Sequence, residues 1–159
     1  MKRIGILRHG KAEHQGTGSQ DRERRLVEKG REAVRAVAAN SACNESHPDM
    51  VVTSPAVRAV ESAEIFSREA GISTPVEIRE ELYAAGPRDI LSLVNGLPDE
   101  VGSILIVGHN PSLEEFCEEI TGEYTGLKTA NLLILDIDAD SWTEIYPPSL
   151  IIQQRLIKP

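Results

Sequence analysis

The sequence predicts an α/β protein of three layers, α/β/α, in which a mostly parallel central sheet has helices on both faces. Short apolar, β-rich runs alternate along the chain with longer segments of helical periodicity, which is the pattern of such folds. The chain has 159 residues without a repeat, a low-complexity tract or a linker. We therefore expect a single domain, residues 1–159, with one core.

Five strands and two later strand-like pieces follow from the apolar runs. The strands are expected at residues 3–7, 50–53, 76–78, 103–107 and 132–137, and the later pieces near 142–146 and 150–155. Helices are expected at residues 26–39, 55–70, 87–94 and 112–122. The small polar residues 16–20 indicate a mobile surface loop after the first strand.

Local signals mark the ends of two of these helices. Ser54 followed by Pro55 is typical of an N-cap and a first helical residue, and Gly71 is expected to end the same helix. Ser112 and Glu115 have the spacing of a capping box. These signals predict where the second and fourth helices begin.

Composition excludes several classes of function. A formal charge of −8 opposes the attraction to polyanions on which nucleic-acid binding depends. The apolar runs are far shorter than the ~20 residues of a membrane helix, and the first of them ends at Arg8 without a cleavage region. Cys43 and Cys117 lack a C-x-x-C spacing and are expected to be reduced. We therefore expect a cytoplasmic protein that binds neither nucleic acid nor membranes.

Three expected strand ends carry cationic or imidazole side chains. Arg8 and His9 follow the first strand, Arg58 lies in the helix after the second, and His109 follows the fourth. Ligands in open α/β sheets bind beyond the carboxyl ends of the strands, so these groups should converge. Two guanidiniums and two imidazoles in an otherwise acidic protein suit a phosphoryl group.

Each of the four side chains has an expected role. Arg8 and Arg58 would bind phosphate oxygens, and His9 would attack phosphorus while its other ring nitrogen is held by an acceptor. Gly10 would allow a sharp turn and a close approach of the backbone to the ligand. His109 would donate to the charge that develops on the transferred oxygens. Taken singly, each is more often a structural or solvated residue, so the prediction depends on their joint occurrence.

Two competing motifs are rejected. Residues 5–12 have the spacing of a P-loop as far as Lys11, but Ala12 stands where a hydroxyl should bind magnesium. His9 and His14, with Glu13 between them, lack the helical spacing of a zinc motif. We expect neither a metal nor a cofactor.

Three stretches of the chain, taken in order, resemble the signatures of one enzyme family. They are Leu7-Arg8-His9-Gly10-Lys11-Ala12, Ser54-Pro55-Ala56-x-Arg58 and Val107-Gly108-His109-Asn110-Pro111. The family is the histidine phosphatase, or phosphoglycerate-mutase-like, superfamily. Asp21-x-x-Arg24-x-Leu26-x-x-x-Gly30 narrows the resemblance to its small SixA-type phosphohistidine phosphatases.

The resemblance implies a phosphoryl acceptor at His9, phosphate binding by Arg8 and Arg58, and a pocket completed by His109. About fifty residues separate Arg58 from His109, too few for the cap insertion of larger relatives. An open site implies a bulky substrate, such as a phosphohistidine on a phosphorelay protein.

The resemblance also implies an acidic proton donor in the Glu80-Glu81-Leu82-Tyr83 region. Either glutamate could match the family's donor, and Glu81 is favoured. The expected function is metal-independent hydrolysis of protein phosphohistidine through a covalent phosphohistidine on His9. The alternatives are a phosphatase for small phosphomonoesters, in which Glu81 acts as the acid, and a module that binds phosphate without turnover.

Overall fold

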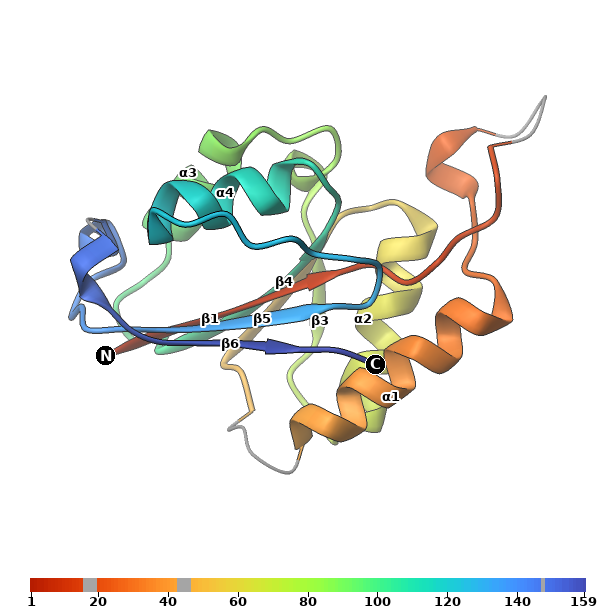
Figure 1. Cartoon of the computed structure of the whole chain (residues 1–159), viewed down its shortest axis with the longest axis horizontal. Coiled ribbons are helices and arrows are strands. Elements are labelled where there is room, and N and C mark those ends of the chain that lie inside the picture. Colours follow the sequence, from red (N-terminus) through yellow and green to blue (C-terminus); the bar gives the residue numbers. More distant parts are fainter. Residues whose placement is uncertain (16–19, 43–46, 147) are drawn as a thin grey trace.

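A six-stranded sheet in the order β3-β2-β4-β1-β5-β6 forms the centre of the computed structural model, which describes residues 1–15, 20–42, 47–146 and 148–159 (Figure 1). The strands are β1 (Lys2–Arg8), β2 (Met50–Thr53), β3 (Val76–Ile78), β4 (Ser103–Gly108), β5 (Leu132–Ile137) and β6 (Ile151–Ile157). The α-helices are α1 (Glu28–Ala42), α2 (Val57–Glu69), α3 (Pro87–Asn95) and α4 (Ser112–Thr121). The 3₁₀ helices are η1 (Asp21–Glu23), η2 (Glu80–Leu82), η3 (Trp142–Glu144) and η4 (Pro148–Leu150).

The sheet is mixed, with the parallel strands on one side. β3, β2, β4 and β1 pair in parallel, whereas β5 is antiparallel to both β1 and β6. The carboxyl ends of β1 and β4 lie side by side, since Arg8 pairs with Gly108 in the ladder. Whatever follows these two strands therefore leaves the sheet at the same edge.

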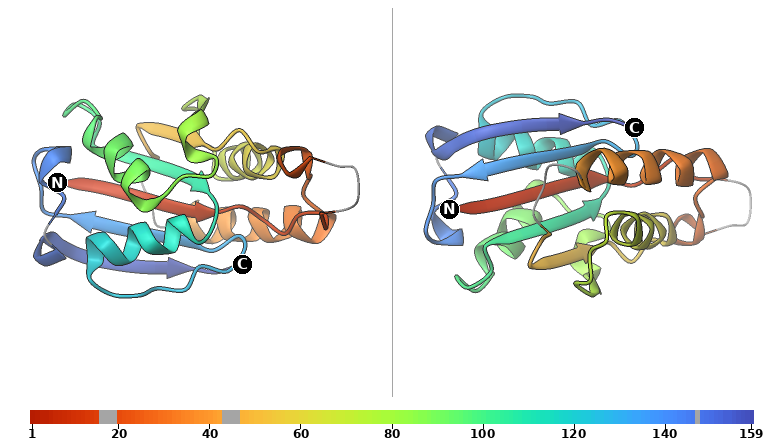
Figure 2. Two further views of the ribbon diagram at one scale, coloured as in Figure 1. Left: turned by 90° about the horizontal axis from the view of Figure 1, so that it is seen from above. Right: turned by 90° about the horizontal axis from the view of Figure 1, so that it is seen from below.

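Helices cover both faces, as Figure 2 shows: α3 and α4 lie on one face, and α1 and α2 on the other. Buried strand residues alternate between the two resulting cores. Ile104 and Ile106 pack toward α3 and α4, whereas Leu105 and Val107 pack toward α1 and α2. Burial on both faces explains why the strands are continuous apolar runs. The three-layer α/β prediction is confirmed, and no inserted cap lies between α2 and β4, where the chain forms only β3, η2 and α3.

The predicted strand near residues 142–146 is wrong, because this segment forms η3. Trp142 is fully buried, and its indole Nε1 donates to the Val101 carbonyl at 2.7 Å. The Ser141 hydroxyl caps the short helix by accepting from the Thr143 amide. Trp142 is thus buried by packing into the core and not by strand pairing, and the last strand is β6.

Neither predicted serine cap forms. Helix α2 begins at Val57, two residues after Pro55, without a side-chain cap, and α4 has Pro111 at its N-cap position. The Ser54 hydroxyl accepts from the Ala56 amide at 3.3 Å, one residue before α2, and lies 2.7 Å from His109 Nε2. The Ser112 hydroxyl donates to the His109 carbonyl at 2.9 Å. Both hydroxyls therefore contact His109, one at its ring and the other at its backbone carbonyl. Gly71 does follow the end of α2, with the positive φ of 70° expected there.

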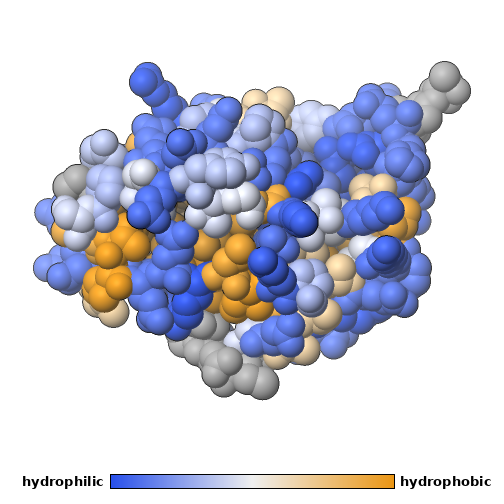
Figure 3. Space-filling view, viewed as in Figure 1, coloured by the Kyte–Doolittle hydropathy of each residue, from blue (hydrophilic) through white to orange (hydrophobic). Residues whose placement is uncertain are grey.

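The surface in the view of Figure 3 is mainly hydrophilic, with apolar areas in the lower middle and at the left. No helix in the part of the chain that the structure describes is long and apolar enough to cross a membrane. The predicted loop at residues 16–20 lies outside the described residues except for Gln20, and so does Cys43. Cys117 is buried and forms no disulfide.

Candidate active site

The structure brings the four predicted side chains together at the carboxyl ends of β1 and β4. Arg8 ends β1 and His9 follows it, His109 follows β4, and Arg58 is the second residue of α2. The rings of His9 and His109 have their centroids 5.0 Å apart. His9 and Arg58 are buried, with 9% and 5% of their surface exposed. Arg8 and His109 are partly buried, so the site is a cluster of cationic and imidazole groups that is half covered by the fold.

His9 is held as a neutral imidazole with a defined tautomer. Its Nδ1 lies 2.7 Å from the Gly10 carbonyl oxygen, and because a carbonyl can only accept, Nδ1 carries the proton. Burial, together with the charges of Arg58, Arg8 and Arg24, lowers the pKa of His9 to about 4 against the opposing effect of the Gly10 hydrogen bond. At neutral pH the Nε2 atom therefore has a free lone pair.

Gly10 is required for close packing behind His9. A Cβ at Gly10 would lie 2.8 Å from the Gly30 carbonyl oxygen, and a Cβ at Gly30 would collide with the backbone of Lys11. The Gly10 amide donates to the Ser62 hydroxyl at 3.0 Å. The two glycines thus let the first turn of α1 approach the backbone that follows β1, which holds the Gly10 carbonyl in place for His9.

His109 is partly buried directly after β4, where its ring contacts Tyr83. Its Nε2 lies 2.7 Å from the Ser54 hydroxyl, and its Nδ1 is buried without a hydrogen-bond partner. Burial lowers its pKa to about 3, and His9 and Arg58 contribute in the same direction. The rings of His109 and Tyr83 meet in a T-shaped arrangement, with their centroids 6.0 Å apart and their planes at 88°. His109 is therefore also neutral at pH 7.

Arg8 is anchored by backbone. Its Nη1 donates to the Leu127 carbonyl at 2.9 Å, and the same oxygen accepts from Asn110 Nδ2 at 2.7 Å. The Leu127 amide in turn donates to the Glu114 carboxylate at 2.7 Å. Arg8 Nε is buried without a partner.

Arg58 is anchored by Asp21, a residue of η1. Its Nη1 donates to the Asp21 carbonyl at 2.7 Å and its Nη2 to Asp21 Oδ2 at 3.0 Å. Tyr83 and Arg24 also bind the Asp21 carboxylate, at 2.7 Å and 2.9 Å. Arg58 Nε, like Arg8 Nε, is buried without a partner.

Three further residues of the site, Asp21, Arg24 and Tyr83, have no role that the sequence alone predicts. Asp21 and Arg24 belong to the motif that narrows the family resemblance, but the spacing of the motif does not indicate what either side chain binds. Tyr83 is the last residue of the segment 80–83, in which the resemblance implies a proton donor. Its contacts with both Asp21 and His109 arise only from the fold.

The structure does not bring Glu81 into this cluster, contrary to prediction. Its side chain is 49% exposed and its carboxylate lies 3.9 Å from Arg79 Nη1. Glu80 is 69% exposed and pairs with Arg22 at 3.1 Å. The physical reason is that η2 turns Leu82 into the core and leaves both glutamates on its outer side. Among the described residues, Asp21 is instead the carboxylate that contacts Arg58.

The arrangement suits a bound anion. Arg8 Nε, Arg58 Nε and His109 Nδ1 are all buried nitrogens without a protein partner, and such atoms are rare in native structures. The two Arg Nε atoms are donors available to an anion, and His109 Nδ1 is a third when the Ser54 hydroxyl donates to Nε2. Within the described ranges, no three His, Cys, Asp or Glu side chains are grouped so that they could bind a metal.

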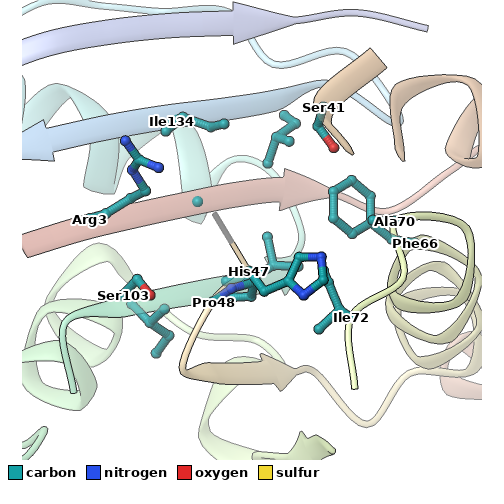
Figure 4. A pocket seen from close by; sticks show the side chains of 13 residues that line it. Arg3, Ser41, His47, Pro48, Phe66, Ala70, Ile72, Ser103 and Ile134 are labelled. Carbon is teal, nitrogen blue, oxygen red and sulfur yellow. The ribbon is translucent and has the colours of Figure 1, made fainter. Parts of the chain in front are cut away.

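A second hollow lies away from this cluster, on the face of the sheet covered by α1 and α2 (Figure 4). Apolar side chains such as Phe66, Ile72 and Leu105 line it, with Arg3 and His47 among the polar ones. It holds none of the four predicted side chains. We therefore assign the candidate active site to the polar cluster rather than to this apolar hollow.

Comparison with known proteins places the chain in a family. The model of the histidine phosphatase superfamily, branch 1, matches residues 4–84. An uncharacterized protein of Mycobacterium leprae is 30% identical over 105 residues, which cover 66% of this chain and 63% of that protein. The chain thus matches less than two thirds of the length of that relative.

Solved structures share the fold. One such structure is of a protein from Agrobacterium tumefaciens that is assigned as the phosphohistidine phosphatase SixA. It is 31% identical to this chain with a TM-score of 0.80, and the match covers 86% of this chain and 92% of that one. The protein histidine phosphatase SixA in complex with tungstate is 21% identical with a TM-score of 0.80, over 98% and 96% of the two chains.

A mycobacterial glucosyl-3-phosphoglycerate phosphatase has a TM-score of 0.64 at 16% identity, over 99% of this chain and 98% of that one. The family model covers the strand that leads to His9, the helix that carries Arg58 and the η2 segment. The chain belongs to the histidine phosphatase superfamily.

Proposed function

We propose that the protein is a phosphatase that hydrolyses phosphohistidine on a protein through a covalent phosphohistidine at His9. One observation carries the proposal: the hydrogen bond from His9 Nδ1 to the Gly10 carbonyl, which leaves a neutral Nε2 as the nucleophile. The pKa of about 4 keeps that atom unprotonated at neutral pH. The charges of Arg58 and Arg8 both act on His9, so an anion attacked by this nitrogen would lie near two guanidiniums.

In the first step, His9 Nε2 forms a bond to phosphorus while the bond from phosphorus to the leaving imidazole of the substrate breaks. The equatorial oxygens accept hydrogen bonds from Arg8, Arg58 and His109. Donors already fixed in place stabilise this charge without reorganisation. The leaving imidazole takes its proton from solvent.

In the second step, water attacks phosphorus and the bond to His9 Nε2 breaks. Inorganic phosphate leaves with the oxygen and one proton of the water, the other proton passes to solvent, and the imidazole of His9 returns to its neutral form. The Gly10 hydrogen bond persists through both steps, because Nδ1 keeps its proton throughout. His9 is thus ready for another cycle.

Three observations favour a protein phosphohistidine as the substrate. The chain between α2 and β4 lacks an inserted cap, so the site can face a macromolecule. Asp21 is held ionised, and Glu80 and Glu81 lie on the outer side of η2, so the described residues supply no evident general acid. A phosphorylated imidazole leaves more readily than an alkoxide and depends less on such an acid. The similarity to the Agrobacterium SixA structure agrees with this choice.

A phosphatase for small phosphomonoesters is the second candidate. The shared fold of the glucosyl-3-phosphoglycerate phosphatase favours it, although at 16% identity that likeness concerns the fold alone. A binding module without turnover is disfavoured, because recognition of phosphate needs arginines but no activated His9. The expected setting remains the cytoplasm.

The test compares hydrolysis of a phosphohistidine peptide, a phosphoserine peptide and a panel of metabolite phosphates by the purified protein. We expect the highest kcat/KM with the phosphohistidine peptide. Replacing both Glu80 and Glu81 by Gln should change that value by less than about 2-fold, because neither contacts the site. A clear preference for small phosphate esters, collapsing in the double variant, would transfer the proposal to the second candidate.

A further inference from the structure

Asp21 is the junction of the polar network behind Arg58. Its Oδ2 accepts from Arg58 Nη2 at 3.0 Å and from the Tyr83 hydroxyl at 2.7 Å. Its Oδ1 accepts from Arg24 Nε at 3.0 Å and Nη2 at 2.9 Å. The carboxylate thus joins η1, the start of α2 and the end of η2 at one point.

Asp21 grips only one edge of the guanidinium. The bonds from Nη1 and Nη2 use the terminal edge of Arg58, whereas Nε, on the adjacent edge, has no partner. The planar fork of arginine can serve two acceptors at once through two edges. Arg58 can therefore keep Asp21 and still donate to a phosphoryl oxygen.

Asp21 is suited to hold a cation and not to move a proton. The hydrogen bond from Tyr83, followed by those from Arg58 and Arg24, holds the pKa of its carboxyl well below the usual range. The carboxylate is therefore ionised at neutral pH. Its contribution to a reaction must pass through the groups that it binds.

We propose, on the basis of the function proposed above, that Asp21 is a positioning residue that orients Arg58 so that its Nε edge faces the phosphoryl group. Tyr83 and Arg24 are the residues that hold Asp21 in place. The rings of Tyr83 and His109 also meet in a T-shaped arrangement, so the side chain of Tyr83 contacts both Asp21 and His109. Orientation of the guanidinium outweighs the repulsion between the Asp21 carboxylate and the bound anion.

The decisive measurement is the affinity for tungstate, used as a phosphate-like anion and measured by calorimetry on the intact protein. Asp21→Ala should weaken binding about tenfold, as expected when a charge-assisted anchor is lost. Asp21→Asn keeps an oxygen that can accept from Arg58 and should stay within about 3-fold of wild type. Tyr83→Phe removes one bond to Asp21 and should weaken binding by about 3-fold.

Glu77→Gln is the matched control, because Glu77 pairs with Arg79 at 3.0 Å on the surface and touches none of these groups. A double-mutant cycle then tests the route. In an Arg58→Ala background, Asp21→Ala should have almost no further effect on tungstate affinity, since its partner is absent. Thermal unfolding of each variant verifies that the site is compared in folded protein.

Asp21→Ala that binds tungstate as tightly as wild type, or more tightly, would overturn the proposal and make the carboxylate a competitor of the anion. An equal loss with and without Arg58 would also overturn it. The phosphohistidine assay separates this inference from the function itself. A wild-type protein that binds tungstate without hydrolysing the peptide would refute the function, while the affinities would still decide the role of Asp21.

Discussion

The two guanidiniums of the site are anchored by opposite kinds of partner. Arg8 donates to the neutral Leu127 carbonyl, which Asn110 shares, whereas Arg58 donates to the carbonyl and the ionised carboxylate of Asp21. Both arrangements hold terminal nitrogens from behind and leave Nε without a partner. Both arginines are thus held through their terminal nitrogens, but the anchor of Arg8 is neutral and the anchor of Arg58 is charged.

This difference separates orientation from charge. The Leu127 carbonyl brings no charge to Arg8, and the negative charge that acts on Arg8 comes from Glu114, which raises its pKa against the lowering by burial. The Asp21 anchor compensates Arg58 directly and adds links to η1 and η2. Arg58 is therefore held by a charged anchor in direct contact, and Arg8 by a neutral one.

The largest expected effects come from removing either guanidinium. Arg8→Ala and Arg58→Ala should each lower kcat/KM for a phosphohistidine peptide by about 10³, since each loses a fixed donor to the transferred oxygens. Lysine at either position should recover little, because a point charge cannot serve an anchor and an anion through two edges. Steady-state kinetics on folded variants measures this. A loss below about 10-fold at one position would show that the two sides are not both clamps.

The charge of Arg58 lowers the pKa of both His9 and His109, and the charge of Arg8 lowers the pKa of His9. Their folded pKa values of about 4 and 3 lie below the ordinary 6.5, so between pH 6.5 and 4 the unfolded chain binds more protons. Stability should thus fall as pH falls through that window, by about 3 kcal/mol for His9 alone. Urea unfolding at pH 7, 5.5 and 4.5 measures the slope.

The control for that slope is a pair of variants. His9→Asn should flatten it, whereas the exposed His47→Asn should leave it as in wild type. An unchanged slope in His9→Asn would show that His9 is not held neutral by the fold. The low pKa of His9, and with it the unprotonated Nε2 of the proposed nucleophile, would then be wrong.

A smaller effect is expected from the support behind Arg8. Glu114→Ala removes the acceptor for the Leu127 amide and should lower kcat/KM about tenfold by loosening the carbonyl that holds Arg8. Glu114→Gln keeps an acceptor oxygen and should stay near wild type. Glu115→Gln, on the same helix but exposed, is the control. Equal losses in the Ala and Gln variants would assign Glu114 an electrostatic role instead.

The sequence was sufficient for the framework of the site. Continuous apolar runs predict buried parallel strands, and the carboxyl ends of such strands meet at one edge, so Arg8, His9 and His109 could be placed together from their positions alone. The structure agrees, since Arg8 pairs with Gly108 directly before His109. Periodicity also located the four α-helices to within a few residues.

The supporting contacts could not be predicted, because their partners lie in irregular segments. Asp21 reaches Arg58 across 37 positions from a 3₁₀ helix, and Leu127 reaches Arg8 across 119 positions from a loop. Local patterns were misleading where a tertiary partner competed with them. Ser54 has the spacing of a helix cap, but its hydroxyl binds the ring of His109, a partner that only folding brings near.

The central claim is that His9 Nε2 forms a bond to phosphorus during turnover. Incubation with a ³²P-labelled phosphohistidine peptide, followed by rapid quenching in alkali and peptide mapping, tests it directly. The account predicts an acid-labile, alkali-stable label on the peptide that contains His9, and no label in His9→Ala. Full hydrolysis by His9→Ala, or label on another residue, would contradict it.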